Sequence, residues 1–440
     1  MGEGLKINSA GIGAFDQIDP PDPQVYLDCV HCGFCLPTCP TYLVLGNEMD
    51  TPRGRIYLIR AASEGKIGIT DGFVKHMELC LLCRNCETVC PSSVRFGSLM
   101  EDVRGQIKRH YNHSPANRLF RRFIRSTFTN MDRLKMITAC LRLYQSSGLQ
   151  RLVKASGILR LLGRLGKMEA LLPALPDQRL RKELPEVMPA KGKKRGRAGL
   201  LLGCVQRFFF PQVNQATARV LSECGYEVVM PESQECCGSL LVHEGDREGS
   251  SEFAKKAIGL FDRLDVDVIV VNAAGCGSVM KEYGRLLRND PAYAEKAETF
   301  SRKVRDVSEL LARVSFGDRL KELDLTVTYH DACHLAHGQR IKGEPRAVIK
   351  MIPGLRCVEL EESDFCCGSA GIYNLLYPEL AQQYLERKIE RIKLTGAQVV
   401  VSGNPGCSLQ IEKGLREHGF NIRLAHPVEL LSWSLQGRVD

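Results

Sequence analysis

Two short cysteine runs near the start of the chain have the residue type and the spacing of metal-cluster ligands. Each run reads Cys-x2-Cys-x2-Cys-x3-Cys-Pro, first from Cys29 to Pro40 and again from Cys80 to Pro91. In bacterial two-cluster proteins this run binds [4Fe–4S] clusters through cysteine thiolates. Zinc sites instead usually take two separated Cys-x2-Cys pairs, with four ligands for each ion. The two matching runs therefore predict two [4Fe–4S] clusters rather than zinc.

The spacing within each run also predicts which cysteines share a cluster. Three cysteines separated by two residues can wrap around one cluster on a tight loop, whereas the fourth lies too far along the chain and binds the other cluster. The proline that follows restricts φ and removes a backbone donor, so the next segment starts there. The predicted ligands are Cys29, Cys32, Cys35 and Cys90 for the first cluster, and Cys80, Cys83, Cys86 and Cys39 for the second.

The segment between the two runs is longer than a minimal two-cluster module needs. Ile56 to Ile59, followed by Ala61 and Ala62, predicts a helix there. We therefore expect a helical ferredoxin type rather than a compact module with strands. Arg53 and Arg55 lie nearby. They either raise the cluster potential by their charge or simply face water or a partner.

A second pattern of cysteines occurs twice in the C-terminal half. Positions 204 and 333 differ by 129, the Cys-Cys-Gly runs at 236 and 366 differ by 130, and positions 276 and 407 differ by 131. Near-equal offsets on a rare residue predict a duplicated unit. Four cysteines in each copy allow a cubane cluster, another metal, a thiol redox pair or inert buried thiols. The candidate further metal sites are Cys204, Cys236, Cys237 and Cys276 in the first copy, and Cys333, Cys366, Cys367 and Cys407 in the second.

Each copy alternates short apolar runs with helical patterns. This alternation predicts a parallel sheet covered by helices. The recurring cysteines then lie at or just after strand ends, the edge of an open α/β sheet where sites form. We therefore expect the cysteines of each copy to converge. The expected strands are Leu200–Leu202, Glu227–Met230 and Val266–Val271 in the first copy, and Leu325–Tyr329, Cys357–Leu360 and Val399–Ser402 in the second.

Other chemically capable side chains have structural explanations as well as functional ones. His330, His334 and His337 flank Cys333. A quinone or metal role is one interpretation of them, and hydrogen-bonded structural histidines near a strand end are the more common one. Three cysteines outside both patterns are expected to be core residues, namely Cys140, Cys224 and Cys357.

The 440 residues are too many for one module. Nineteen cysteines in a chain with no apolar segment behind Lys6 point to reduced, metal-binding thiols in the cytosol rather than disulfides. No run approaches the roughly 18 consecutive apolar residues of a membrane span. We expect a multidomain α+β protein. Its predicted parts are a helical ferredoxin-like two-cluster domain at 1–110, a basic helical connector at 111–197, and two repeated α/β Cys-Cys-Gly domains with parallel sheets at 198–317 and 318–440.

Positive charge is concentrated between residues 104 and 200. That range holds 23 Lys and Arg against 5 Asp and Glu, a local excess of +18 in a chain whose net charge is +9. Leu119, Phe120 and Phe123 alternate with arginines. This pattern suits a helix on an anionic membrane surface, or a helix packed on its own protein or on a partner subunit. Nucleic acid is not expected, because no aromatic platform or reader motif accompanies the charge.

The chain lacks the sequence signature of a nucleotide cofactor site. No G-x-G-x-x-G follows a predicted strand, and no Walker-A run is present. Clusters alone move electrons one at a time. A flavin or nicotinamide that oxidises a substrate is therefore expected on another subunit, and no catalytic residue is assigned to this chain.

Nearly the whole chain resembles the iron–sulfur subunits of bacterial glycolate oxidase, also called glycolate dehydrogenase. The two cysteine runs carry part of the resemblance. Its more particular carriers are residues 52–59 (PRGRIYLI), residues 281–284 (KEYG) and residues 366–371 (CCGSAG).

This resemblance implies an electron-transfer role. In such a complex a partner flavin subunit oxidises glycolate to glyoxylate, and a second flavin-type subunit accompanies it. The iron–sulfur subunit passes the electrons through two [4Fe–4S] clusters to a membrane acceptor, for which quinone is expected. A cytoplasmic chain, peripheral on the cytoplasmic face of the inner membrane, is implied. The iron–sulfur subunits of lactate and glycerol-3-phosphate dehydrogenases share the architecture and are the alternatives.

The Cys-Cys-Gly copies also resemble those of heterodisulfide reductases, which gives a further alternative. In those proteins the pattern ends in Cys-x2-Cys, and the fifth cysteine helps to hold an unusual non-cubane cluster. Here Val279 and Gln410 occupy the fifth positions. This departure argues against thiol–disulfide catalysis at these copies.

Overall fold

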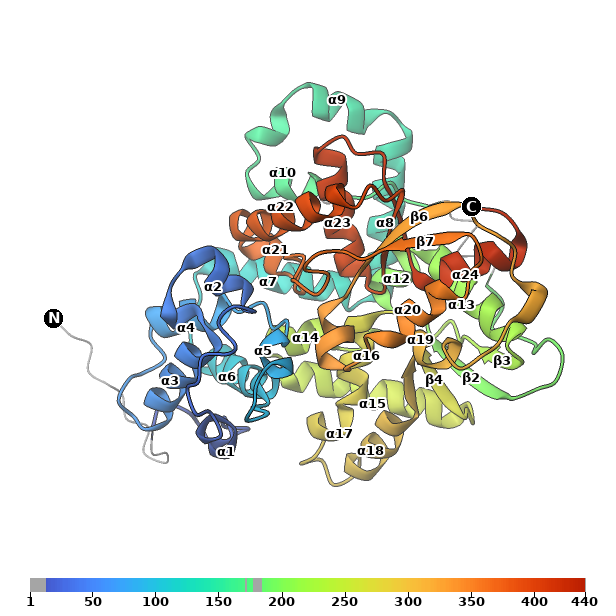
Figure 1. Cartoon of the computed structure of the whole chain (residues 1–440). Coiled ribbons are helices and arrows are strands. Elements are labelled where there is room, and N and C mark those ends of the chain that lie inside the picture. Colours follow the sequence, from blue (N-terminus) through green and yellow to red (C-terminus); the bar gives the residue numbers. More distant parts are fainter. Residues whose placement is uncertain (1–12, 171, 177–183, 440) are drawn as a thin grey trace. The chain divides into compact units, whose positions relative to one another are not determined.

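The computed structural model describes residues 13–170, 172–176 and 184–439 of the chain (Figure 1). These residues form two compact units. The N-terminal unit comprises the described residues up to Phe123 together with Leu240–Ser250. The C-terminal unit comprises Ile124–Ser239 and the described residues from Ser251 onward.

The described residues of the N-terminal unit form helices joined by loops, without a strand, as the sequence predicts. The expected helix between the cysteine runs is α3, which begins where Thr51 accepts a hydrogen bond from the Gly54 N–H and Pro52 occupies the first turn. A proline in the first turn costs no helical hydrogen bond, because the N–H that it lacks would have no partner within the helix. The elements are α1 (Pro23–Leu27), α2 (Pro40–Leu45), η1 (Glu48–Asp50), α3 (Pro52–Ser63), α4 (Asp71–Glu78), α5 (Asn85–Thr88), α6 (Phe96–His110) and most of α7 (Pro115–Phe128).

The core of this unit lies between α3, α4 and α6. Ile59, Met77, Leu99, Met100 and Val103 are fully buried there. Leu99, Met100 and Val103 lie on α6 at intervals of three to four residues. This is the spacing of the apolar face that an amphipathic helix buries. This packing fixes the helices between which the two cysteine loops run.

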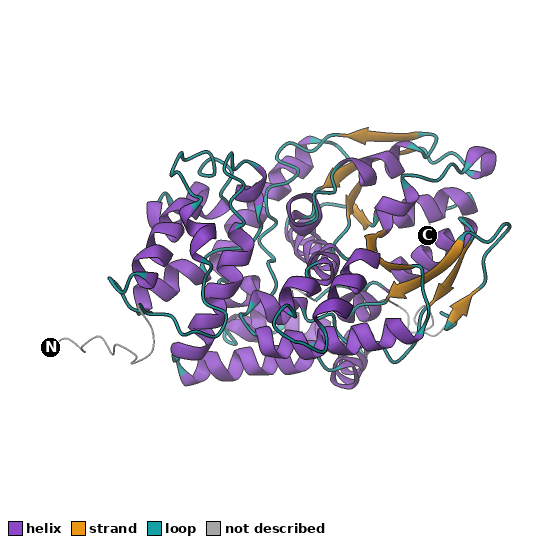
Figure 2. Cartoon of the chain, turned by 90° about the horizontal axis from the view of Figure 1, so that it is seen from below, coloured by secondary structure: helices purple, strands orange, loops and turns teal. Residues whose placement is uncertain are grey.

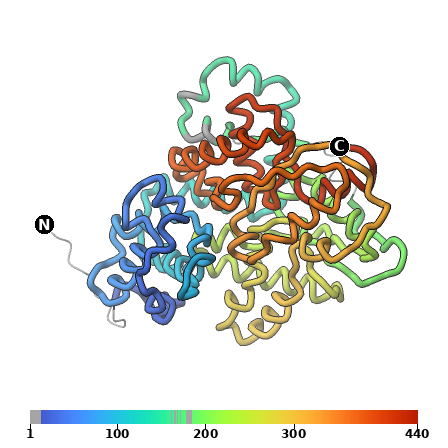
Figure 3. Tube along the Cα trace, in the orientation of Figure 1, coloured from blue at the N-terminus to red at the C-terminus, as the bar shows by residue number. Residues whose placement is uncertain are grey.

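The connector is helical in its described residues up to Ala170, whereas its C-terminal end contains the strand Val187–Met188 and the start of the strand Gly196–Leu201. Its helices are α7, α8 (Met131–Ser146), α9 (Leu149–Ala155), η2 (Ile158–Arg160) and α10 (Arg164–Ala170). After α10, Arg142 and Gln145 of α8 donate hydrogen bonds to the carbonyls of Pro176 and Pro173. The helices α9 and α10 form the teal loop at the top of the trace in Figure 3. Leu134 and Thr138 mark the buried face of α8. Cys140 lies on another face and is exposed, so its predicted core position is wrong.

Two sheets, each flanked by helices, form the rest of the C-terminal unit (Figure 2). The first sheet has the strand order β1-β3-β2-β4-β5, and its strands are parallel except for the short edge strand β1. The strands are β1 (Val187–Met188), β2 (Gly196–Leu201), β3 (Tyr226–Val229), β4 (Val268–Val271) and β5 (Val304–Asp306). The helices of this copy are α12 (Cys204–Phe209), α13 (Pro211–Glu223), α14 (Ser239–His243), α15 (Arg247–Arg263), α16 (Ala274–Lys281), α17 (Tyr283–Leu286), α18 (Ala294–Lys303) and α19 (Val307–Leu311). Within α14 and α15, the residues of Leu240–Ser250 belong to the N-terminal unit.

The second sheet is parallel throughout, in the order β7-β6-β8-β9. Its strands are β6 (Leu325–His330), β7 (Leu355–Val358), β8 (Val399–Ser402) and β9 (Arg423–Ala425). The other elements are η3 (Gly317–Arg319), η4 (His334–Gly338), α20 (Gly343–Lys350), α21 (Tyr373–Leu376), α22 (Pro378–Leu394), α23 (Pro405–Glu417) and α24 (Pro427–Gln436).

The two copies share one fold and one core. Each of the six expected strands is present, and the sheets are parallel as predicted, whereas the fourth strands β5 and β9 and the antiparallel edge strand β1 were not expected. Helices pack reciprocally between the copies: α13 of the first lies against α24 of the second, and α20 of the second against α19 of the first. Apolar residues of both copies, such as Val220 and Leu430, belong to one buried cluster. The duplication therefore produces two halves that bury each other's helices.

Candidate functional site

Both cysteine runs of the N-terminal unit fold as loops with left-handed backbone at the same two positions. In the first loop His31 and Gly33 have φ values of 54° and 85°, and in the second Leu82 and Arg84 have 54° and 63°. Residues with a Cβ seldom adopt this conformation. Its recurrence at matching places in both runs points to one loop shape that directs the cysteines inward.

The first predicted ligand set lines one cavity. Cys29, Cys32, Cys35 and Cys90 border it, together with Cys86. Burial raises the pKa of the Cys35 thiol to about 11. It also raises the pKa of Cys29, to which the nearby Cys90 and Cys32 contribute. Such thiols stay neutral at pH 7 unless a metal displaces their protons. The structure thus brings the fourth cysteine of the second run to the first three of the first run.

The second predicted ligand set also comes together. Burial, followed by the neighbouring Cys83, Glu87, Cys80 and Cys39, raises the pKa of the Cys86 thiol well above its usual value. Cys39 is thus near enough to affect Cys86 of the other run, and it also affects Cys35 of its own run.

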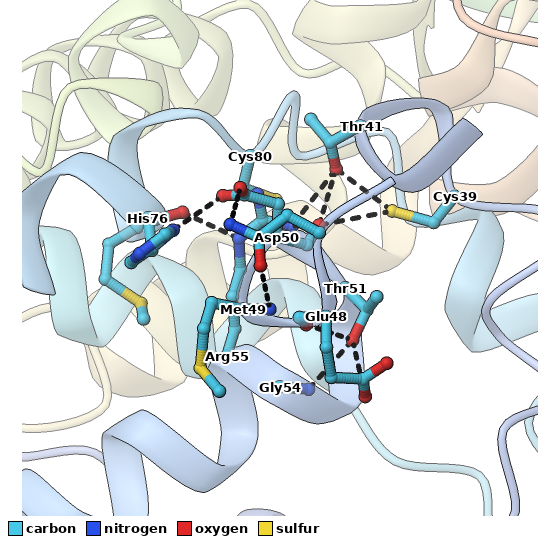
Figure 4. Close-up of polar contacts among 12 residues, drawn as sticks. Cys39, Thr41, Glu48, Met49, Asp50, Thr51, Gly54, Arg55, His76 and Cys80 are labelled. Atoms are coloured by element: carbon cyan, nitrogen blue, oxygen red, sulfur yellow. Dashed lines mark hydrogen bonds and ion pairs between the residues drawn. The ribbon is translucent and has the colours of Figure 1, made fainter. Parts of the chain in front are cut away.

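A buried arginine holds the segment on which Cys39 depends (Figure 4). Arg55 is fully buried, and its Nη1 donates to the Asp50 carbonyl oxygen at 2.6 Å and to Thr41 Oγ1 at 3.2 Å. The Thr41 hydroxyl lies 3.0 Å from Cys39 Sγ. Arg55 Nε donates to the carbonyl oxygen of His76 at 2.7 Å. The interpretation that Arg55 faces water or a partner is therefore wrong. Its contacts position the loop around Cys39.

Arg53 is different, because its side chain is partly exposed. Its Nε donates to Glu48 Oε1 at 2.6 Å, and its Nη1 reaches the carbonyl oxygen of His31 at 3.4 Å. His31 lies within the first cysteine loop. Arg53 therefore lines the cavity of the first ligand set and places a positive charge beside it.

The first Cys-Cys-Gly copy gathers its four cysteines at the carboxyl ends of β2, β3 and β4. Cys236 Sγ lies 3.9 Å from Cys204 Sγ. Hydrogen bonding between these two thiols, with burial, raises the pKa of Cys204 well above its usual value. Cys237 contacts Cys276, and its thiol pKa is also raised. Tyr283 Oη donates to the Cys237 carbonyl oxygen at 2.7 Å, which fixes the backbone of the pair.

The second copy gathers its cysteines in the same way at the ends of β6, β7 and β8. Cys366 contacts Cys333 and Cys367, which together with burial raises its thiol pKa. Hydrogen bonds from Cys366 and Cys407, aided by His330, hold the pKa of Cys367 well below its usual value. Gly368 has a φ of 87°, and a Cβ there would lie 2.7 Å from the carbonyl oxygen of Ala381. Only glycine therefore fits after this cysteine pair.

Two buried cationic or basic side chains accompany the second set. His330 ends β6, and its ring lies beside the thiols of Cys367 and Cys407. Lys388 is 1% exposed on α22; burial lowers its pKa to about 8. Its Nζ donates to the carbonyl oxygens of Glu362 and Ser363 at 2.5 and 3.2 Å. The sequence analysis did not single out Lys388, although it lies within the apolar stripe of α22 that also contains Leu385, Ile389 and Ile392.

The other histidines and cysteines near this set lie outside it. His334 and His337 are buried on η4, and His337 Nε2 is 3.8 Å from Asp364 Oδ2. Cys357 lies half-buried on β7, and Cys224 is buried in the apolar core. The fifth positions of the heterodisulfide-reductase pattern hold a buried Val279 and a buried Gln410, whose Oε1 accepts from Asn374 Nδ2 at 2.9 Å.

Among the residues that the structure describes, no helix has both the length and the apolar character needed to cross a bilayer.

Family models match most of the chain. A 4Fe–4S dicluster domain matches residues 26–94, the linker region of the glycolate oxidase iron–sulfur subunit matches 116–172, and a cysteine-rich domain matches 198–281 and again 327–412. The N-terminal unit is therefore an iron–sulfur dicluster domain, and the duplication coincides with two cysteine-rich domains.

Curated relatives cover nearly the full length. The chain is 39% identical to the probable glycolate oxidase iron–sulfur subunit of Bacillus subtilis (strain 168), over 93% of this chain and 94% of that protein. It is 33% identical to the glycolate oxidase iron–sulfur subunit of Escherichia coli (strain K12), with the same coverage. Lactate utilization protein A of an Exiguobacterium strain is 29% identical over 53% of this chain and 96% of that protein. The chain belongs to the family of glycolate oxidase iron–sulfur subunits.

Proposed function

We propose that this chain is the electron-transfer subunit of a glycolate-oxidising complex, in which it receives electrons from a partner flavin subunit and delivers them to a membrane acceptor such as quinone. Two [4Fe–4S] clusters would supply one-electron redox chemistry when bound. Cys29, Cys32, Cys35 and Cys90 would hold one cluster, and Cys80, Cys83, Cys86 and Cys39 would hold the other. The chain's own part is to hold, insulate and orient these two groups.

The observation that carries this proposal is the exchange of fourth cysteines between the two loops. Cys90 lines the cavity of the first three cysteines, and Cys39 is among the neighbours that raise the pKa of the buried Cys86. Each loop would then contribute to both sites, and the two clusters would lie next to each other. Adjacent clusters suit a relay, because electrons pass between neighbouring centres without a diffusing carrier.

The ligand sets are tested by iron analysis of single variants. Cys35→Ser and Cys86→Ser each remove one proposed ligand from a different set, and Cys140→Ser replaces an exposed cysteine outside both sets. We expect about eight irons per chain in the N-terminal unit of the parent, loss of about half in either ligand variant, and no loss in Cys140→Ser. Dye reduction by the complex should fall with the iron. Full iron content in both ligand variants would refute the ligand sets, and full dye reduction would refute the relay.

An exposed apolar surface beside the first ligand set suits the partner flavin subunit. Val30 and Phe34 lie between the cysteines of the first loop, and their side chains are 68% and 64% exposed. Leu27 on the preceding helix is 55% exposed. Large apolar side chains that are exposed together mark interaction sites more often than a free surface. A subunit docked there would cover the edge of the cluster nearest to solvent and shorten the path for electrons.

The connector suits the membrane side of the relay. Leu143, Leu152 and Leu161 are each at least 69% exposed, and exposed basic residues such as Arg151 and Lys154 accompany them. Apolar side chains that enter the lipid, together with basic side chains that attract anionic headgroups, give an interfacial surface. The purified complex should therefore bind phosphatidylglycerol vesicles more strongly than phosphatidylcholine vesicles.

A pair of variants tests this connector surface. Leu152→Asp combined with Leu161→Asp should weaken vesicle binding, because carboxylates replace the apolar contacts. Leu394→Asp is the matched control, since Leu394 is 73% exposed on α22, outside the connector. Equal vesicle binding by all three proteins would contradict the membrane role of the connector and leave the electron relay unaffected.

A further inference from the structure

Arg104 on α6 contacts the first cysteine of the second ligand set. Its Nη2 donates to the Cys80 carbonyl oxygen at 2.6 Å and, at the longer distance of 3.5 Å, to that of Met77. Its Nη1 donates to the carbonyl oxygen of His243 at 2.7 Å. All of these residues belong to the N-terminal unit, because that unit includes Leu240–Ser250. The guanidinium therefore lies against the backbone of a proposed cluster ligand.

No carboxylate pairs with Arg104 among the residues that the structure describes. Its hydrogen bonds all go to neutral backbone carbonyls, and its Nε is buried without an acceptor. A charge that is removed from water is costly unless an opposite charge lies nearby. An anionic group held beside this side chain would therefore be stabilised by it.

Three other arginines beside the cysteine loops are ion-paired. The pairs are Arg84 with Glu87 at 3.2 Å, Arg55 with Asp50 at 3.5 Å, and Arg53 with Glu48 at 2.6 Å. A carboxylate at such a distance cancels most of the field of its cation. Arg104 therefore gives the second ligand set an uncancelled positive charge, whereas the charge of Arg53 beside the first set is largely neutralised.

The segment Leu240–Ser250 covers Arg104 and limits its contact with water. The backbone of Gly245 packs so closely that a Cβ would have no room against the Arg104 carbonyl oxygen. The ion pair of Arg247 with Asp102 of α6 anchors the segment there. A charge that is partly buried in this way is screened less by water and salt than a charge on the surface.

We propose that Arg104 raises the reduction potential of the cluster held by the second ligand set above that of the cluster held by the first, and so directs electrons from the first to the second. This inference rests on the proposed function and its two ligand sets. A cluster bound by thiolates is anionic, and it gains one negative charge when it is reduced. A nearby cation without a counter-charge therefore stabilises the reduced form more than the oxidised form.

This order of potentials suits the place where electrons would enter the chain. The exposed apolar side chains proposed to meet the flavin subunit, Val30 and Phe34, lie in the first cysteine loop. An electron that enters there would pass next to a centre of higher potential. The transfer forms and breaks no bond and moves no proton: the first cluster loses one electron, the second gains it, and the flavin subunit supplies the next one.

The alternative is that Arg104 only caps two helices. Met77 and His243 lie at the carboxyl ends of α4 and α14, where backbone carbonyls lack helical partners and basic side chains often bind them. Arg104→Gln separates the two roles, because glutamine keeps an N–H donor for a carbonyl but carries no charge. Arg104→Lys keeps the charge with a different donor geometry.

Redox titration of the full-length, iron-loaded protein, followed by EPR, provides the test. Cys35→Ser and Cys86→Ser, each of which should keep one cluster, assign the two signals. In the parent the second cluster should be reduced at the higher potential. Arg104→Gln should lower the equilibrium constant for its reduction at least tenfold, which corresponds to about 59 mV for one electron. The potential of the first cluster should stay closer to its parent value, and Arg104→Lys should stay closer to the parent at both clusters.

Arg60→Gln is the matched control, because it removes the same charge from a side chain of the same unit that is 48% exposed and paired with Glu64. It should shift neither potential. A shift as large as that of Arg104→Gln would assign the effect to the net charge of the protein and overturn the proposal. An unchanged second potential in an Arg104→Gln protein with full iron would overturn it as well.

The order of the two potentials in the parent is an independent readout that needs no arginine variant. A first cluster with the higher potential would overturn the proposal, even if Arg104→Gln retained too little of the second cluster to be titrated. Iron analysis comes before any potential is measured. Full iron in both Cys35→Ser and Cys86→Ser would refute the ligand sets of the proposed function, which is a result distinct from a failure of Arg104 to set the order.

Discussion

Asn404 joins the two Cys-Cys-Gly domains through a single amide side chain. Its Oδ1 accepts a hydrogen bond from the Gly275 N–H at 3.2 Å, and its Nδ2 donates to Cys407 Sγ at 3.4 Å. Gly275 precedes Cys276, so the amide touches one cysteine site directly and the neighbouring residue of the other. The adjacent Gly403 carbonyl oxygen accepts from the Ala274 N–H at 3.0 Å. The loops that carry Cys276 and Cys407 are therefore held against each other.

Asn404→Leu should loosen both sites together. The variant loses two hydrogen bonds, so we expect a loss of about 1–3 kcal/mol in the free energy of unfolding of the C-terminal unit. Urea unfolding would measure it through Trp433, the single tryptophan of the chain, which lies in α24 of that unit. Thiol labelling should become faster at Cys276 as well as at Cys407. Faster labelling at Cys407 alone would mean that the amide does not couple the two domains.

Gly33→Ala should weaken cluster retention, whereas Gly46→Ala should not. Both glycines have left-handed φ values, 85° and 63°, so each alanine costs roughly 1 kcal/mol of backbone strain. A Cβ at Gly33 would also lie 2.8 Å from Arg53 Nη1, but nothing lies within 4 Å of one at Gly46. Gly33 is part of the first cysteine loop and Gly46 is not. Iron content after gel filtration distinguishes the two, and equal losses would argue against a shape requirement of the loop.

Arg55→Leu should destabilise the N-terminal unit far more than Arg53→Leu. Removing Arg55 takes away the buried cation 3.5 Å from Asp50 and leaves that carboxylate with His76 at 2.9 Å. Breaking a buried ion pair costs up to about 3–5 kcal/mol. The ion pair of Arg53 with Glu48 is partly exposed and contributes little. Thermal unfolding of the iron-loaded protein is the measurement. Similar melting temperatures for the two variants would show that Arg55 does not hold the Cys39 segment.

If the proposed flavin subunit docks at the first cysteine loop, Phe34→Asp should prevent it from copurifying without loss of iron. The side chain is 64% exposed, so a carboxylate there disturbs no core but opposes an apolar contact. Leu394→Asp, at a comparably exposed site, should copurify normally. Loss of iron in Phe34→Asp would instead indicate that this residue shields the cluster, and normal copurification would place the docking surface elsewhere.

The C-terminal unit should lose stability as the pH falls below about 6.5. Burial lowers the pKa of His426 from 6.5 to about 3, and its Nδ1 accepts a hydrogen bond from the Val428 N–H at 3.1 Å at the start of α24. Because the unfolded chain binds the proton more readily, the stabilisation is complete above pH 6.5. Below that pH, the free energy of unfolding decreases by about 1.4 kcal/mol for each pH unit, until the pH approaches 3.

His426→Asn tests this acid sensitivity, because asparagine can accept the same helix-capping hydrogen bond but does not titrate. Urea unfolding at pH 7.5 and 5.5, followed by Trp433 fluorescence, should show a smaller difference in the variant than in the parent. The same pH dependence in both proteins would assign the acid sensitivity to another group.

The sequence by itself determined the features that depend only on residue type and on spacing along the chain. The two cysteine runs and the duplicated Cys-Cys-Gly pattern depend on residue type and spacing, and six apolar runs were sufficient to place six strands. These features are local in the sequence or repeat at a fixed interval, so they can be recognised without the tertiary structure. The short strands β1, β5 and β9 left no comparable apolar signal, since two or three residues are too few to show a pattern.

Only the tertiary structure decided what the isolated polar residues do. Arg55, His330 and Lys388 are buried by segments distant in sequence, and Asn404 joins two domains. Cys140, in contrast, is exposed because the apolar stripe of α8 passes on another face. Whether a charged or basic side chain is solvated or enclosed depends on which helices cover it, and that follows from packing between distant elements. The sequence therefore identified the cysteines, and the fold selected the partners that make the two copies different.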